Sequence, residues 1–113
     1  MIKFKVQDLS KDNLYEAYRM AYNIDYPNDT YFRDYPDLWA KIGQLIETFE
    51  IDVKKLCLES RFKDDDTYGS WFSGISVKNE MGISKYYTAY GHTAREAIVR
   101  CYVKSRLGEE ITL

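Results

Sequence analysis

The spacing of apolar and polar residues predicts a short strand and then a helix at the start of the chain. Residues 2 to 6 alternate apolar side chains with lysine, which is typical of a half-buried strand with one wet face. Apolar residues then recur at the three- and four-residue intervals that place side chains on one face of a helix. This spacing predicts a first helix from Lys11 to about Asn23, with Ser10 as its N-cap.

The middle of the chain predicts a second helix and a three-stranded meander. A wide apolar face at helical spacing predicts a helix from about Asp37 to Phe49, which Gly43 weakens in its middle. Three runs that alternate with a period of two follow, separated by polar turns at 63–67 and 79–82. The strands are expected at Ile51 to Phe62, Trp71 to Val77 and Ile83 to Tyr90.

The last helix carries the clearest boundary signals. Thr93 and Glu96 have the spacing of a capping box, and Gly108 is a typical stop after the final turn. These signals predict a helix from Ala94 to Leu107. Its expected buried stripe consists of Ala97, Ile98, Cys101 and Tyr102.

The order of these elements, β-α-α-β-β-β-α, predicts the fold class. Strands that are grouped, and do not alternate strictly with helices, indicate an α+β fold. We expect an antiparallel sheet of three to four strands with helices packed on one face. A length of 113 residues fits a single domain that spans 1–113.

Composition and charge narrow the function classes. The chain has 16 basic and 18 acidic residues, a net charge of −2, which argues against generic binding to a nucleic-acid backbone. No apolar run approaches the length that spans a membrane, and residues 1–6 lack the apolar core of a signal peptide. We therefore expect a soluble, intracellular protein.

Candidate chemistry is sparse. His92 is the one histidine and precedes a helix N-cap, and Cys57 and Cys101 occupy positions patterned as buried and inert. The acidic run 64–66 lacks the ligand spacing of a calcium loop, and the glycines form no phosphate-binding pattern. The sequence predicts no catalytic residue, no metal site and no cofactor, so we expect a protein that is not an enzyme.

One segment, residues 22–37, has the composition of a recognition surface. It holds four of the eleven tyrosines and both prolines, each proline in an Asp-Tyr-Pro tripeptide. Some of these tyrosines are expected to anchor the loop. The others would form an aromatic patch rimmed by carboxylates, which suits contact with a basic protein partner. The candidate contact residues are Tyr22, Asp25, Tyr26, Asp29, Tyr31, Asp34 and Tyr35.

The last helix offers an alternative, a nucleic-acid face. A meander followed by a basic helix is broadly the layout of double-stranded RNA-binding domains. Against this reading, Glu96, Glu109 and Glu110 accompany the cations, and a lysine cluster at the first turn is absent. An ordinary solvated helix face is the stronger interpretation. The residues of this alternative face, expected on the wet side of the helix, are Arg95, Arg100, Lys104 and Arg106.

Several short motifs, in order along nearly the whole chain, are shared with one family. They include the opening strand, the central segment Tyr35-Pro36-Asp37-Leu38-Trp39-Ala40 with its later Leu45-Ile46-Glu47, and Trp71 in a middle strand. The closing motif comprises Thr93, Ala94, Ala97, Arg100-Cys101-Tyr102-Val103, Ser105 and Leu107-Gly108-Glu109-Glu110. In these stretches the chain resembles the small phage proteins of the NinX-like family. Residues 23–34 have no counterpart there, and 42–44 replace a stretch richer in glycine and proline.

The resemblance implies a phage or prophage origin and a small accessory protein in a bacterial cytoplasm. It supplies no catalytic residue. Residues 22–37, which we name the Tyr/Asp segment, add a candidate contact surface. Together with the resemblance, this segment leads us to expect a protein that binds and modulates or inhibits a host protein, such as a defence or nucleic-acid-processing complex. A small nucleic-acid-binding module is the alternative.

Overall fold

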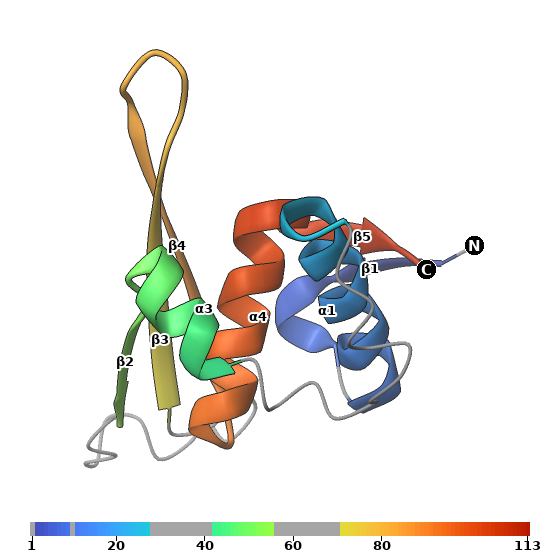
Figure 1. Cartoon of the computed structure of the whole chain (residues 1–113). Coiled ribbons are helices and arrows are strands. Elements are labelled where there is room, and N and C mark those ends of the chain that lie inside the picture. The colour runs from blue at the N-terminus through green and yellow to red at the C-terminus, as the bar shows by residue number, and fades with distance from the viewer. Residues whose placement is uncertain (1, 10, 28–41, 56–70) are drawn as a thin grey trace.

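A computed structural model describes residues 2–9, 11–27, 42–55 and 71–113 of the chain (Figure 1). The described elements form an α+β fold with two antiparallel sheets, which confirms the predicted class. In chain order they are β1 (Lys3–Lys5), a 3₁₀ turn η1 (Val6–Asp8), α1 (Lys11–Asp25), α3 (Ile42–Phe49), β2 (Asp52–Lys55), β3 (Trp71–Lys78), β4 (Ser84–Gly91), α4 (Ala94–Leu107) and β5 (Glu110–Thr112).

The larger sheet is the predicted meander, in the order β2-β3-β4. In its register Phe72 lies opposite Tyr90, and Asp52 lies opposite Gly74. As expected, the helices gather on one side of this sheet (Figure 1). α4 lies between the sheet and α1. The described part of the first strand of the meander is short, and positions 56–62 of that prediction lie outside the described residues, as do positions 37–41 of the predicted second helix.

The N-terminal strand belongs to a second sheet that the sequence did not predict. β1 pairs with β5 in antiparallel register, with Phe4 opposite Ile111. Ile2 and Leu113 extend the pairing, since each backbone N–H donates to the carbonyl oxygen of the other at 3.0 Å. β5 has three residues and one buried side chain, Ile111, which is too short for alternation to give a signal.

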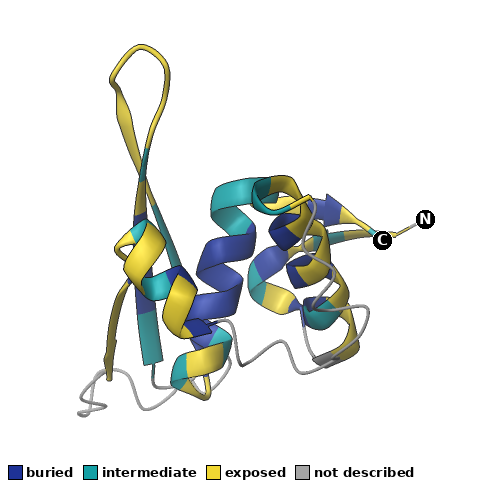
Figure 2. Ribbon diagram, viewed as in Figure 1, coloured by how far each residue is buried: buried dark blue, intermediate teal, exposed yellow. Residues whose placement is uncertain are grey.

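The core is built around α4, in which every residue from Ala97 to Val103 is buried (Figure 2). The predicted stripe is correct but too narrow, because Val99 and Val103 are buried as well. A helix packed on two sides needs apolar residues around most of its circumference. Burial raises the pKa of the Cys101 thiol to about 11, which fits the inert thiol expected there. Cys57 lies outside the described residues.

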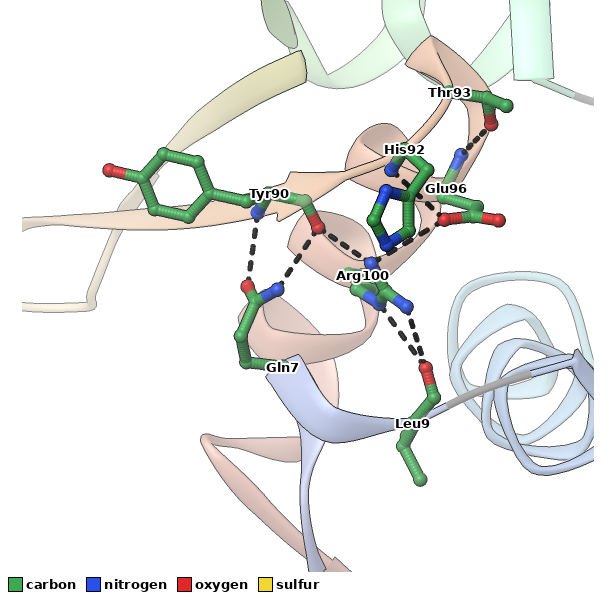
Figure 3. Close-up of polar contacts among 7 residues, drawn as sticks. All are labelled: Gln7, Leu9, Tyr90, His92, Thr93, Glu96 and Arg100. Atoms are coloured by element: carbon green, nitrogen blue, oxygen red, sulfur yellow. Dashed lines mark hydrogen bonds and ion pairs between the residues drawn. The ribbon is translucent and has the colours of Figure 1, made fainter. Parts of the chain in front are cut away.

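The turn η1 is fastened to the edge of β4 by one side chain (Figure 3). The Gln7 carboxamide accepts a hydrogen bond from the Tyr90 N–H at 3.0 Å and donates to the Tyr90 carbonyl oxygen at 3.1 Å. An amide that both donates and accepts substitutes for a neighbouring strand at this position. The backbone groups of Tyr90 therefore point away from β3.

The start of α4 is capped by the side chain of Thr93. The Thr93 hydroxyl oxygen accepts from the Glu96 N–H at 3.2 Å, while the Glu96 carboxylate accepts from the His92 N–H at 3.1 Å, one residue earlier than in a standard capping box. Thr93→Ala should lower the free energy of unfolding by about 1 kcal/mol in urea melts, because the Glu96 N–H loses its partner. Thr93→Ser is the control, since it keeps the oxygen. Equal stability of both variants would mean that the cap contributes nothing.

Candidate functional site

The first half of the Tyr/Asp segment is part of the core. Tyr22 has 0% exposed surface and packs edge-on against Tyr18, with ring centroids 6.4 Å apart. Its other neighbour is Tyr26, at 4.6 Å, whose half-buried ring packs on the core. A side chain with no exposed surface cannot contact a partner protein, so Tyr22 is not part of a recognition surface.

Asp25 is also used internally, although it was expected to form a wet carboxylate rim. Its carboxylate accepts a hydrogen bond from the Tyr102 hydroxyl and forms an ion pair with Arg106 Nε at 2.9 Å. Burial, and then the hydrogen bond to Asp25, raise the pKa of Tyr102. Asp25 therefore ties the end of α1 to α4. The other candidates of this segment, Asp29, Tyr31, Asp34 and Tyr35, lie outside the described residues.

The prediction that Arg100 lies on the wet side of the last helix is wrong. Its residue surface is only 8% exposed. Its guanidinium donates to the carbonyl oxygens of Leu9 and Tyr90, each at 2.8 Å (Figure 3). Burial lowers the pKa of Arg100, an effect that the nearby Glu96 carboxylate opposes. Because α4 is enclosed between the sheet and α1, its polar side chains are used to satisfy backbone groups.

The remaining cations of α4 do not form a continuous basic face. Lys104 Nζ donates to the Thr88 carbonyl oxygen at 2.8 Å. Arg106, besides its ion pair, stacks on the Phe49 ring with the guanidinium carbon 4.3 Å from the centroid. Of the four cations proposed for the nucleic-acid face, Arg95 alone is exposed. The phosphate-contacting strip expected for nucleic-acid binding is therefore absent from this helix.

A different feature stands out in the described part of the fold: the β3–β4 hairpin projects well beyond the helices (Figure 1). Its tip is ordered by Asn79, whose side-chain oxygen accepts from the N–H groups of Met81 at 2.9 Å and Ile83 at 3.0 Å. Gly82, at φ 80°, supplies the left-handed residue of the turn. This confirms the hairpin predicted at 79–82. We name residues 75–87 the hairpin arm.

The hairpin arm exposes large apolar and aromatic side chains. Met81 is 83% exposed, Ile83 60% and Tyr86 52%. Figure 2 shows the outer part of the hairpin as exposed, whereas its base, beside the helices, is buried or half-buried. This surface was not predicted from the sequence, because the alternation of β4 is typical of ordinary strand packing. The clustering of Met81 and Ile83 around a polar turn was the available signal.

Both edges of the hairpin arm carry backbone groups that no described strand pairs. The Tyr90 backbone points away from β3, so the Phe72–Tyr90 pair is one of the non-hydrogen-bonded pairs that alternate along an antiparallel ladder. Because the two kinds of pair alternate along the ladder, every second pair is non-hydrogen-bonded. Ser76–Tyr86 and Lys78–Ser84 are therefore non-hydrogen-bonded pairs as well. The N–H and C=O groups of Ser76 and Lys78 therefore face the β2 side, and those of Ser84 and Tyr86 face the opposite edge.

A pocket of about 290 Å³ lies beside the β3 edge of the arm. One wall is the end of α3, and the other is β3 itself. The lining residues are Thr48, Phe49, Glu50, Ile75, Ser76, Val77, Lys78 and Arg106. The pocket thus combines apolar surface, two cations and a strand edge.

Comparisons with known proteins identify no relative. No family model matches the chain, and neither the curated proteins nor the solved structures include a significant match to it. Within the described ranges, no group of histidine, cysteine and acidic side chains has the arrangement of a metal site. None of the described helices combines the length and apolar character needed to cross a bilayer.

Proposed function

We propose that this protein is a non-enzymatic binding protein that contacts a partner protein through the hairpin arm. The observation that carries the proposal is the exposure of Met81, Ile83 and Tyr86 on a hairpin that projects from the fold. An ordered turn holds these apolar side chains in water. The free energy of the system falls when a partner removes them from solvent, so their exposure favours binding. Methionine and tyrosine are also enriched at the cores of protein interfaces.

The charge pattern supports a protein partner over a nucleic acid. The hairpin arm carries Lys78 and Lys85 but also Glu80, and the whole chain has a net charge of −2. Three of the four cations of α4 bind backbone oxygens or Asp25, namely Arg100, Lys104 and Arg106. Binding to a nucleic-acid backbone draws on several unpaired cations that release counterions together.

The biological setting is a further part of the proposal. The resemblance of the chain's motifs to NinX-like proteins supports a phage or prophage accessory protein that acts in the bacterial cytoplasm. Its partner would then be a host protein, modulated or inhibited by the contact, such as a component of a defence or nucleic-acid-processing complex.

Affinity capture from bacterial lysate tests the contact, with two matched variants. Ile83→Asp places a charge on the arm, whereas Ile24→Asp places one on α1, where the side chain is similarly exposed, at 57% against 60%. We expect the partner recovered by the wild type to fall by about tenfold or more with Ile83→Asp, because an interface core excludes unpaired charge. Recovery with Ile24→Asp should equal that of the wild type.

Circular dichroism of both variants checks that each is folded. The proposal is overturned if the two variants recover every partner equally well, since the arm would then be irrelevant to binding.

A further inference from the structure

Within the described ranges, no strand pairs with the part of β3 that lies beyond Gly74 on the β2 side. β2 begins at Asp52, opposite Gly74, whereas β3 continues to Lys78. Extending the register backward along β2 would place Glu50 opposite Ser76. The chain instead turns away there, because Glu50 adopts a left-handed conformation, φ 51°, and the Ile51 N–H donates to the Ile46 carbonyl oxygen at 3.1 Å to close α3.

The backbone of β3 is prepared for pairing at this position. The N–H and C=O groups of Ser76 and Lys78 face it, and no described residue satisfies them. An open strand edge is a template for an additional strand, and main-chain hydrogen bonds supply much of the affinity in such complexes. The pocket of about 290 Å³ lies along the same edge, so a strand added there would have space for side chains.

The walls of the pocket indicate which side chains would fit. Phe49, Ile75 and Val77 offer apolar surface on the two sides. Arg106 is held in a fixed position, since its guanidinium stacks on Phe49 and its Nε bonds to Asp25. No described residue accepts a hydrogen bond from the two terminal nitrogens of Arg106, so their N–H groups can donate to a carboxylate. Lys78 adds a second cation at the rim, against one carboxylate, Glu50.

We propose that an extended segment of a partner protein, carrying an acidic side chain, adds to the edge of β3 at Ser76 and Lys78, which no described strand covers, as a new strand. This inference rests on the proposed function, because it specifies how the arm would bind a protein. Its backbone would pair with Ser76 and Lys78, and its acidic side chain would lie near Arg106 and Lys78. A second copy of this chain fits less well, since the β3 edges of two arms each carry Lys78, and like charges on paired strands repel.

Short synthetic peptides test the groove without the natural partner. The probes are a fluorescent peptide of alternating Val and Thr with a central Glu, and the same peptide with a central Lys. We expect the Glu peptide to bind about tenfold more tightly in anisotropy titrations, as charge complementarity favours it. Hydrogen exchange should slow at the Ser76 and Lys78 amides on binding. Failure of the Glu peptide to bind at millimolar concentration overturns the proposal.

Proline substitutions on the two edges provide a matched pair. Ser76→Pro removes a donor from the β3 edge, and Ser84→Pro removes one from the β4 edge of the same arm. Binding of the Glu peptide should weaken about tenfold or more with Ser76→Pro and stay unchanged with Ser84→Pro. The reverse result, or concentration-dependent self-association in place of peptide binding, would show that the other edge or a second copy is used.

An exposed charge reversal keeps the test decisive if Ser76→Pro does not fold. Lys78→Glu should reduce the preference for the Glu peptide over the Lys peptide, and an unchanged preference contradicts the proposed charge complementarity. Loss of lysate capture by Ile83→Asp together with failure of the peptide test would reject this groove and leave the contact by the hairpin arm intact. Peptide binding together with normal lysate capture by Ile83→Asp would support this groove and reject the contact through the exposed apolar side chains of the hairpin arm.

Discussion

Replacing Arg100 with methionine is expected to lower the free energy of unfolding by about 3 kcal/mol. Methionine can fill much of the same space but donates no hydrogen bond. The Leu9 carbonyl oxygen would lose both its donors, Nε at 3.3 Å and a terminal nitrogen at 2.8 Å. The Tyr90 carbonyl oxygen would keep one donor, from Gln7. Most of the cost therefore comes from the desolvated carbonyl of Leu9.

Two further variants separate this explanation from a general loss of helix stability. Arg100→Lys keeps the charge, but one ammonium group cannot reach both carbonyls in the same geometry, so we expect a loss of about 1–2 kcal/mol. Arg95→Met, on the exposed side of α4, should change stability by less than about 1 kcal/mol. The measurement is equilibrium unfolding in urea, and equal losses for Arg100→Met and Arg95→Met would contradict a structural role for the buried guanidinium.

The best predicted parts of the fold are those fixed by signals close together in the sequence. Thr93 and Gly108 predict the two ends of α4. The Thr93 Oγ accepts from the Glu96 N–H, and the Gly108 N–H donates to the Lys104 carbonyl oxygen, as expected for helix caps. The turn at Asn79 is equally local, because its side chain bonds only to backbone N–H groups two and four residues later. Such short-range contacts do not depend on how the rest of the chain packs.

The environment of Arg100 depends on residues far away in the chain. Its carbonyl partner Leu9 is 91 residues distant, and no local pattern encodes that contact. A partial signal was present, since Val99 and Val103 put apolar side chains beside the cations on the face assigned to water. Two apolar stripes on one helix indicate that it is covered on two sides.

The Tyr/Asp segment shows why composition alone is a weak guide to a surface. Tyrosine is compatible with both a core and an interface, because its ring is apolar and its hydroxyl needs one polar partner. Asp25 is the acceptor that allows Tyr102 to be buried, across 77 residues of sequence. The hairpin arm escaped prediction for a related reason: alternation in a strand looks the same whether or not a helix covers the strand's inner face.

Replacing Gly91 with alanine is the second large effect that we expect, a loss of about 2–3 kcal/mol in the free energy of unfolding. Gly91 ends β4 where the first turn of α4 crosses the sheet. A Cβ atom there would lie 2.5 Å from the Ala97 backbone nitrogen and 2.7 Å from Glu96 Cβ. The helix backbone cannot rotate away as a side chain can, so α4 would have to move off the sheet on which the core is built.

The same substitution at two other glycines provides the controls for this mechanism. At Gly74 the three atoms nearest to the new methyl group would all belong to the exposed Tyr86 side chain, which can swing aside, so the loss should be less than about 1 kcal/mol. At Gly43 in α3 nothing lies within 4 Å, and alanine should stabilise the protein by about 1 kcal/mol through helix propensity. Urea melts of the three variants should therefore rank Gly43→Ala above Gly74→Ala and Gly91→Ala last. A Gly91→Ala protein as stable as the wild type would mean that α4 does not approach the sheet so closely in solution.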